Sequence, residues 1–168
     1  TKVFTRGLIE VSSFCKNDCL YCGIRRSNAT AQRYRLSADE IVKCANTGYD
    51  LGFRTFVLQG GEDPFFTDDV LCGIIGRIRA AHPDCAVTLS FGERSRKSYE
   101  RLHEAGAERY LLRHETASPA LYRRWHPPEM SLGNRMRCLS DLREIGYAVG
   151  AGFMAGAPFQ TAADLACD

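Results

Sequence analysis

Apolar residues alternate along this chain between two patterns. Short apolar runs, typical of strands in a buried parallel sheet, are separated by segments in which apolar residues recur every three or four positions, as in amphipathic helices. The runs predict five strands, at Leu8–Val11, Thr55–Leu58, Val87–Phe91, Tyr110–Leu112 and Tyr147–Met154.

Helix signals fill the intervals between these runs. Ser37 and Glu40 form a capping box, and Gly52 lies past the end of the helix that it opens. Ser118-Pro119 and Thr161 are typical of helix starts, and Gly106 and Gly146 of helix ends. The expected apolar stripes are Ile41, Val42, Ala45 and Tyr49; Val70, Ile74, Ile75 and Ile78; Tyr99, Leu102 and Ala105; and Leu132, Met136, Leu139, Leu142 and Ile145.

Five successive βα units predict an α/β fold with a parallel sheet, either a barrel or a doubly wound sheet. A complete eightfold barrel needs about 250 residues, whereas this chain has 168 and a helix begins near its end. We therefore expect residues 1–168 to be a single core domain, an incomplete barrel of about five βα units. We expect it to be truncated on its C-terminal side and also on its N-terminal side.

The composition is that of an ordinary globular protein, with 45% hydrophobic residues, 25% charged residues and a net charge of +2. No basic stripe indicates nucleic-acid binding, and no apolar run is long enough for a membrane span. The first residues have no signal-peptide pattern. Eight cysteines without an export signal favour metal binding or burial over disulfides, and hence a reducing cytoplasm.

Three of the cysteines, Cys15, Cys19 and Cys22, follow the first strand with the spacing C-x3-C-x2-C. Thiolates are ligands for iron–sulfur clusters and zinc, and three of them on one four-iron cubane leave the fourth iron open. Three alternatives compete: structural zinc, for which no neighbouring residue supplies a fourth ligand; a redox pair of Cys19 and Cys22; and chance clustering. The other five are expected to be small apolar fillers: Cys44, Cys72, Cys85, Cys138 and Cys167.

With Tyr21 at the aromatic position, the motif C-x3-C-x-(aromatic)-C resembles the signature of the radical S-adenosylmethionine (SAM) superfamily. Nearly the whole chain resembles the radical SAM maturases of [FeFe]-hydrogenase, the HydE type, which are relatives of biotin synthase and methylornithine synthase. The stretch Arg113–Ala117 points to the maturase branch. The similar segments follow in order: Gln59–Pro64, Ser90–Glu93, Arg113–Ala117, Gly133–Arg135 and Gly150–Thr161.

The resemblance implies a TIM-like radical SAM barrel with a [4Fe–4S] cluster on the three cysteines and SAM on the open iron. Such an enzyme cleaves SAM reductively to a 5′-deoxyadenosyl radical, here in maturation of the hydrogenase H-cluster. The implied partners are a small-molecule or organometallic substrate, a reductant such as ferredoxin or flavodoxin, and other hydrogenase maturases, with no nucleic acid and no membrane. No catalytic residue is assigned.

The resemblance also implies contacts for each part of SAM. The amino group would lie on Gly60, Gly61 and Glu62, the carboxylate on Arg135, the ribose on Glu115, and the adenine between Tyr21 and Met154. The plainer alternatives are a surface arginine for Arg135, an ion pair with Arg113 for Glu115, and a core methionine for Met154.

Thr88 and Arg113 are expected to face the substrate, and Glu93 lies on the same rim without an assigned role. Most of these segments directly follow a strand, which is the face that carries the active site in β/α barrels.

The chain departs from the family pattern at two places. Phe159 stands where relatives favour glycine, and the segment His126–Met130 is one residue longer than is typical. Without the closing strands, the isolated chain is expected to expose a sheet edge and to be poorly active. The alternatives are a biotin synthase-like or methylornithine synthase-like enzyme, and a non-enzymatic metal or Fe–S protein.

Overall fold

Five parallel strands form one sheet in the computed structural model, which describes residues 5–168. The strands are β1 (Gly7–Ser12), β2 (Thr55–Gly60), β3 (Ala86–Ser90), β4 (Ala107–Leu111) and β5 (Ala148–Gly150). Residues 1–4, which entered the expectation about a signal peptide, lie outside the described part. The strands lie in sequence order, β1-β2-β3-β4-β5. A doubly wound sheet reverses its strand order at one point, whereas a barrel does not, so the order selects the barrel-type fold.

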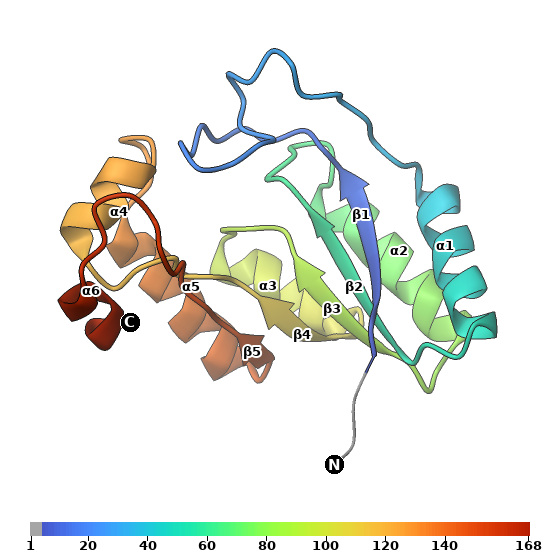
Figure 1. Ribbon diagram of the computed structural model, residues 1–168. Coiled ribbons are helices and arrows are strands. Elements are labelled where there is room, and N and C mark those ends of the chain that lie inside the picture. Colours follow the sequence, from blue (N-terminus) through green and yellow to red (C-terminus); the bar gives the residue numbers. More distant parts are fainter. Residues whose placement is uncertain (1–4) are drawn as a thin grey trace.

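Four helices cover one side of this sheet: α1 (Ala38–Asp50), α2 (Asp68–Ala81), α3 (Arg96–Glu104) and α5 (Leu132–Ile145). Each packs against the next, α1 on α2, α2 on α3 and α3 on α5 (Figure 1). Two short helices, α4 (Pro119–Trp125) and α6 (Ala162–Cys167), follow β4 and β5 and lie beyond α5 in this view.

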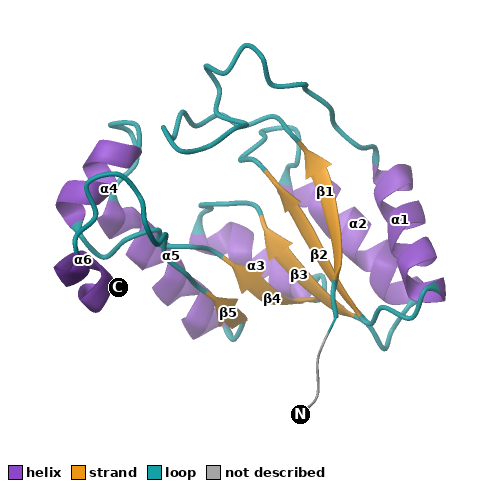
Figure 2. Ribbon diagram, in the orientation of Figure 1, coloured by secondary structure: helices purple, strands orange, loops and turns teal. Residues whose placement is uncertain are grey.

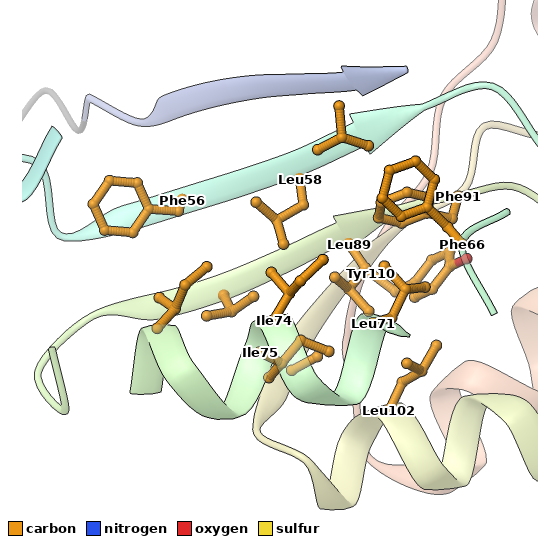
Figure 3. Packing of buried hydrophobic residues seen from close by; sticks show 14 of the residues in the cluster. Phe56, Leu58, Phe66, Leu71, Ile74, Ile75, Leu89, Phe91, Leu102 and Tyr110 are labelled. Atoms are coloured by element: carbon orange, nitrogen blue, oxygen red, sulfur yellow. The ribbon is translucent and has the colours of Figure 1, made fainter. Parts of the chain in front are cut away.

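The hydrophobic core lies between the sheet and these helices. In Figure 3, Ile74 of α2 points toward Leu58 of β2 and Leu89 of β3, and Leu71, Ile74, Ile75, Leu58 and Leu89 are all at most 1% exposed. Burying each of them contributes roughly 1.5–3 kcal/mol. The sheet is therefore a rigid base from which the loops at its carboxyl end project.

The helix boundaries follow the predicted signals. Ser37 and Glu40 form the expected capping box of α1. Gly106, past the end of α3, and Gly146, at the end of α5, have φ values of +110° and +108°, a left-handed conformation that glycine adopts without strain.

Three elements differ from their prediction. The fourth strand, expected at Tyr110–Leu112, begins three residues earlier and covers Ala107–Leu111. The fifth strand covers only Ala148–Gly150, and beyond it the pairing with the segment after β4 continues only as an isolated bridge between Glu115 and Phe153. In α5 the buried stripe is Arg135, Cys138 and Leu142, whereas Met136 is 49% exposed. Periodicity read from apolar residues could not place a buried arginine on the inner stripe.

Among residues 5–168, no helix is both long enough and apolar enough to cross a membrane.

Candidate functional site

The loops that follow the strands gather at one end of the sheet, where Figure 2 shows them beyond the strand arrowheads. They surround a cavity of about 570 Å³, which we call the central cavity. Segments after all of the first four strands contribute to it, together with the first turn of α5. Most of the predicted site residues line it: Cys15, Cys19, Tyr21, Cys22, Gly60, Gly61, Glu62, Arg113, Glu115 and Arg135.

The cysteines lie on a long loop, residues 13–35, which leaves β1 and returns beside it. Its two ends are joined where the Ser13 backbone N–H donates to Tyr34 O (3.1 Å) and the Tyr34 N–H donates to Ser13 Oγ (2.8 Å). Arg33 reaches inside the loop and donates to four backbone carbonyls, including those of Ile24 and Arg25. One planar guanidinium therefore organises a loop that contains no regular secondary structure.

An ion pair between the partly exposed Arg35 and the buried Asp63 fixes this loop to the sheet. Arg35 donates from Nε and Nη2 to the two carboxylate oxygens of Asp63, at 2.7 and 2.9 Å. The Ser12 hydroxyl donates to the same carboxylate at 2.7 Å, and the guanidinium lies over the rings of Phe14 and Phe65. The bidentate geometry sets the direction in which the cysteine loop leaves β1.

All three motif cysteines face the central cavity as free thiols. Burial raises the pKa of Cys15, and it raises the pKa of Cys19 to about 11. In the described part of the chain, no three His, Cys, Asp or Glu side chains converge as ligands of a single ion. A cubane spreads its thiolates around several iron atoms, so its ligands need no such common point.

The Gly60–Glu62 segment supports the cysteine loop directly. A Cβ at Gly61 would lie 2.2 Å from Phe14 O and 2.7 Å from Cys15 Cβ, so only glycine fits there. The carbonyl of Glu62 accepts from the Lys16 N–H at 3.0 Å, and its carboxylate pairs with Lys16 Nζ at 3.1 Å. The close approach that glycine allows is therefore to the cysteine loop itself.

Glu62 also holds the turn after β3. Its Oε1 accepts from the Glu93 N–H at 3.0 Å, and a Cβ at Gly92 would lie 2.1 Å from that oxygen. From the hydrophobic core, the buried hydroxyls of Tyr99 on α3 and Tyr110 on β4 both donate to Gly92 O, at 3.2 and 3.0 Å. The turn is thus fixed from two sides.

This turn presents Glu93 to Arg135. Arg135 Nε donates to Glu93 Oε1 at 2.7 Å, and Nη1 donates to Arg113 O at 2.6 Å. Arg135 is only 6% exposed. Burial acts to lower the pKa of its guanidinium, but neighbouring groups, Glu93 among them, keep that pKa above its ordinary value. Arg135 is therefore a buried cation at the cavity wall and not a surface arginine.

Glu115 has an unusual backbone and an unusual side chain. Its φ of +69° is rare for a residue other than glycine. Backbone hydrogen bonds hold it there, from Glu115 N–H to Gly152 O (3.1 Å) and from Met154 N–H to Glu115 O (3.0 Å). Oε1 pairs with Arg113 Nε at 3.2 Å, while the buried Oε2 has no hydrogen-bond partner within residues 5–168. A buried acceptor without a partner at a cavity wall suits a donor on a ligand.

A family model described as the radical SAM superfamily matches residues 9–166, nearly the whole chain. The chain belongs to the radical SAM superfamily. Membership implies a [4Fe–4S] cluster and SAM as cofactors.

Curated relatives within this superfamily include the [FeFe] hydrogenase maturase subunit HydE of Thermotoga maritima. It is 48% identical over 167 residues, which is 99% of this chain and 47% of HydE. A 3-methylornithine synthase of Methanosarcina barkeri is 28% identical over 92% of this chain and 44% of its own length. The chain spans about half the length of these curated relatives.

Solved structures of the superfamily share the fold. Methylornithine synthase (PylB) superposes with a TM-score of 0.85 at 26% identity, over 92% of this chain and 46% of that one. The FeFe-hydrogenase maturase HydG of Carboxydothermus hydrogenoformans superposes with a TM-score of 0.80 at 29% identity, over 89% and 36% of the two chains.

The central cavity fits the two radical SAM cofactors. Its three free thiols face a common space, which suits a cluster held by three thiolates. Arg135 offers a buried cation on the same wall, which suits a carboxylate, and the partnerless Oε2 of Glu115 suits a hydroxyl donor. The ion pair of Glu115 with Arg113 is present, and the second carboxylate oxygen remains available to a ligand.

Two of the expected contact residues do not line the cavity. Thr88 is 7% exposed and lies within β3, where it pairs in register with Val57 of β2. Met154 is held by the Glu115 carbonyl and by Gln160, which donates to its backbone oxygen at 2.6 Å. Met154 is therefore adjacent to the cavity through its backbone.

Sequence reasoning missed several positioning residues. Glu93 had no assigned role, although it holds Arg135, and Arg33, Arg35 and Asp63 were not singled out. The Arg35–Asp63 pair joins positions 28 residues apart and the Glu93–Arg135 pair positions 42 apart, and local spacing carries no signal for such pairs. Arg33 acts within its own loop, on backbone carbonyls that no sequence pattern identifies. The expectation of apolar fillers is confirmed for the buried Cys85 and Cys138 and is wrong for Cys44 and Cys167, which are exposed.

Proposed function

We propose that this chain is the cofactor-binding core of a radical SAM enzyme that acts in [FeFe]-hydrogenase maturation. The observation that carries the proposal is the 48% identity to a HydE over 99% of the chain. The identity to 3-methylornithine synthase is 28%, which makes a methylornithine synthase-like activity the weaker alternative. The length of the relatives supports the further proposal that more barrel strands complete this single domain.

The proposed residue roles follow from the cavity. Cys15, Cys19 and Cys22 would hold a [4Fe–4S] cluster, and Arg135 would bind the SAM carboxylate while Glu93 keeps its guanidinium in place. Glu115 would accept a hydrogen bond from a ribose hydroxyl at its free oxygen. When bound, the reduced cluster and SAM supply a 5′-deoxyadenosyl radical.

The neighbouring residues divide the remaining tasks. Gly60 and Gly61 offer backbone close to the SAM amino group, while the Glu62 carboxylate is engaged with Lys16 and Glu93. Arg113, whose side chain is 62% exposed, pairs with Glu115 through Nε and would offer its terminal nitrogens to a substrate carboxylate.

The proposed substrate is a small or organometallic molecule, with a one-electron donor such as ferredoxin or flavodoxin and with other maturases as partners. A reducing cytoplasm is the compartment that suits free thiols such as those of this chain.

Complementation tests the assignment. A host that lacks its HydE-type maturase should regain [FeFe]-hydrogenase activity with the full-length protein that contains this chain and with its Cys44→Ala variant, whose thiol is exposed and distant in sequence from the motif, but not with Cys19→Ala. Hosts that lack biotin synthase or methylornithine synthase should not be rescued. Rescue of either of those hosts, or of the hydrogenase host by Cys19→Ala, would overturn the assignment.

A further inference from the structure

The last turn of α4 holds the middle of the cysteine loop through two adjacent residues. The backbone N–H of Leu20 donates to Trp125 O at 2.8 Å. The hydroxyl of Tyr21 lies 2.9 Å from His126 Nε2. His126 follows α4 directly and opens the loop that leads to α5.

The direction of the Tyr21–His126 hydrogen bond is determined by the other ring nitrogen. His126 Nδ1 lies 2.9 Å from the carbonyl oxygen of Tyr122, which can only accept, so Nδ1 carries the proton. In the neutral ring Nε2 is then an acceptor, and the Tyr21 hydroxyl donates to it. Burial, followed by the nearby charge of Arg135, lowers the pKa of His126 to about 4, which keeps the ring neutral at physiological pH.

The packing of His126 makes it a rigid acceptor. Its ring is stacked on Tyr122, with centroids 3.8 Å apart and planes 12° from parallel, and it meets Tyr21 edge-on at 5.3 Å. His126 is 5% exposed and does not itself line the central cavity, whereas Tyr21 does. The histidine therefore acts on the cavity only through the orientation of the tyrosine ring.

We propose that His126 is a positioning residue that holds the ring of Tyr21 against the central cavity and so shapes the wall on which the nucleoside part of SAM binds. The inference rests on the proposed function and adds a residue that the motif does not contain. Outer hydrogen bonds of this kind orient the groups that touch a cofactor.

Four variants separate this role from general stabilisation. Tyr21→Phe removes the donor and keeps the ring; His126→Phe removes the acceptor and keeps an aromatic ring over Tyr122; His126→Gln keeps an amide near Nε2; and the double variant combines the first two. His82→Phe is the matched control, because His82 is also stacked on a tyrosine, Tyr49, with centroids 4.0 Å apart, on the outer helices.

The variants are compared in the anaerobically reconstituted protein. SAM affinity is measured by titrating the electron paramagnetic resonance (EPR) signal of the reduced cluster with SAM, and KM and kcat are measured from SAM cleavage. The rate at which a chelator removes iron in the absence of SAM measures how firmly the cysteine loop holds the cluster. Tyr21→Phe and His126→Phe should each weaken SAM binding and raise KM by about threefold to tenfold, the range for loss of one hydrogen bond, with kcat nearly unchanged. The double variant should be no worse than either single variant, His126→Gln should recover most of the loss, and His82→Phe should equal the wild type.

Additive losses in the double variant, wild-type affinity in His126→Phe, or equal losses in His126→Gln and His126→Phe would overturn the inference. If His126→Phe does not retain the cluster, Tyr21→Phe and His126→Gln decide, because only the first should weaken SAM binding. A loaded wild type that does not respond to SAM refutes the proposed function instead. In that case the iron-removal rates test the Tyr21–His126 hydrogen bond by itself. If it holds the loop, Tyr21→Phe and His126→Phe should lose iron faster than His126→Gln.

Discussion

At the scale of single residues, two positive-φ positions shape the central cavity by different means. Glu115, at φ +69°, accepts backbone strain that β4 and the segment after β5 hold in place, and its carboxylate remains directed at the cavity. Gly92, also at φ +69°, carries no strain but leaves room for Glu62. The first conformation directs the carboxylate of Glu115, and the second leaves space for the carboxylate of Glu62.

Gly92→Ala should destabilise the protein by about 2 kcal/mol or more, because the new Cβ meets both an unfavourable φ and the Glu62 carboxylate at 2.1 Å. Urea unfolding measures the loss. Gly76→Ala is the control: it lies in α2 with nothing within 4 Å of the new Cβ, and should stabilise by about 1 kcal/mol. A neutral Gly92→Ala would show that the turn after β3 relaxes freely.

Single residues also mark the limit of sequence reasoning. The cysteine spacing and the position of Glu115 after a strand could be read directly. The role of Glu93 could not, because its partner Arg135 lies 42 residues away on a helix whose apolar pattern places that arginine outside. Phe159 has a φ of +69°, a conformation that glycine adopts more readily than phenylalanine, and its ring lies 4.6 Å from the guanidinium carbon of Arg124.

At the scale of elements, the loop of residues 13–35 is ordered by two arginines instead of by helix or strand. Arg33 satisfies carbonyls inside the loop, and Arg35 joins the loop to Asp63 after β2. Burial alone would raise the pKa of Asp63, but hydrogen bonds from Arg35 and Ser12 hold it below its ordinary value. The ion pair therefore contributes stability above the unfolded-state pKa of about 4, and this contribution is lost as the pH falls through the lower folded-state pKa.

Asp63→Asn should lower the free energy of unfolding by about 2 kcal/mol at pH 7, because it removes the charge that compensates Arg35. The difference from the wild type should shrink as the pH falls below about 4. Urea unfolding at pH 7 and pH 3 measures both. The exposed pair of Arg54 and Asp84 provides the control, since Asp84→Asn should cost less than about 1 kcal/mol. An equal loss at the two pH values would contradict this account.

Element boundaries were predictable where capping and periodicity act together, as in α1. They were not where glycines interrupt a strand, as in β5, which is shorter than its apolar run suggests. The lengths of such strands depend on side chains from neighbouring elements, which the run itself does not contain.

At the scale of the whole molecule, the parallel strands place the loops that follow them at one end of the sheet. Because β1 to β5 are parallel and sequential, their carboxyl ends lie along one edge, and residues from distant parts of the sequence meet there. In the described part of the chain, β1 and β5 each have one neighbouring strand, and the end of β1 also pairs with Arg35 through an isolated bridge. The alternating sequence pattern predicted this arrangement because it is repeated five times, although no single repeat could have established it.

The central claim is that three thiolates hold a four-iron cluster with one iron left open for SAM. It is tested most directly by iron analysis and EPR of the anaerobically reconstituted and reduced protein, with and without SAM. The account predicts about four irons per chain and a reduced-cluster signal that changes when SAM is added. One tightly bound zinc per chain, or an iron signal that SAM leaves unchanged, would contradict it.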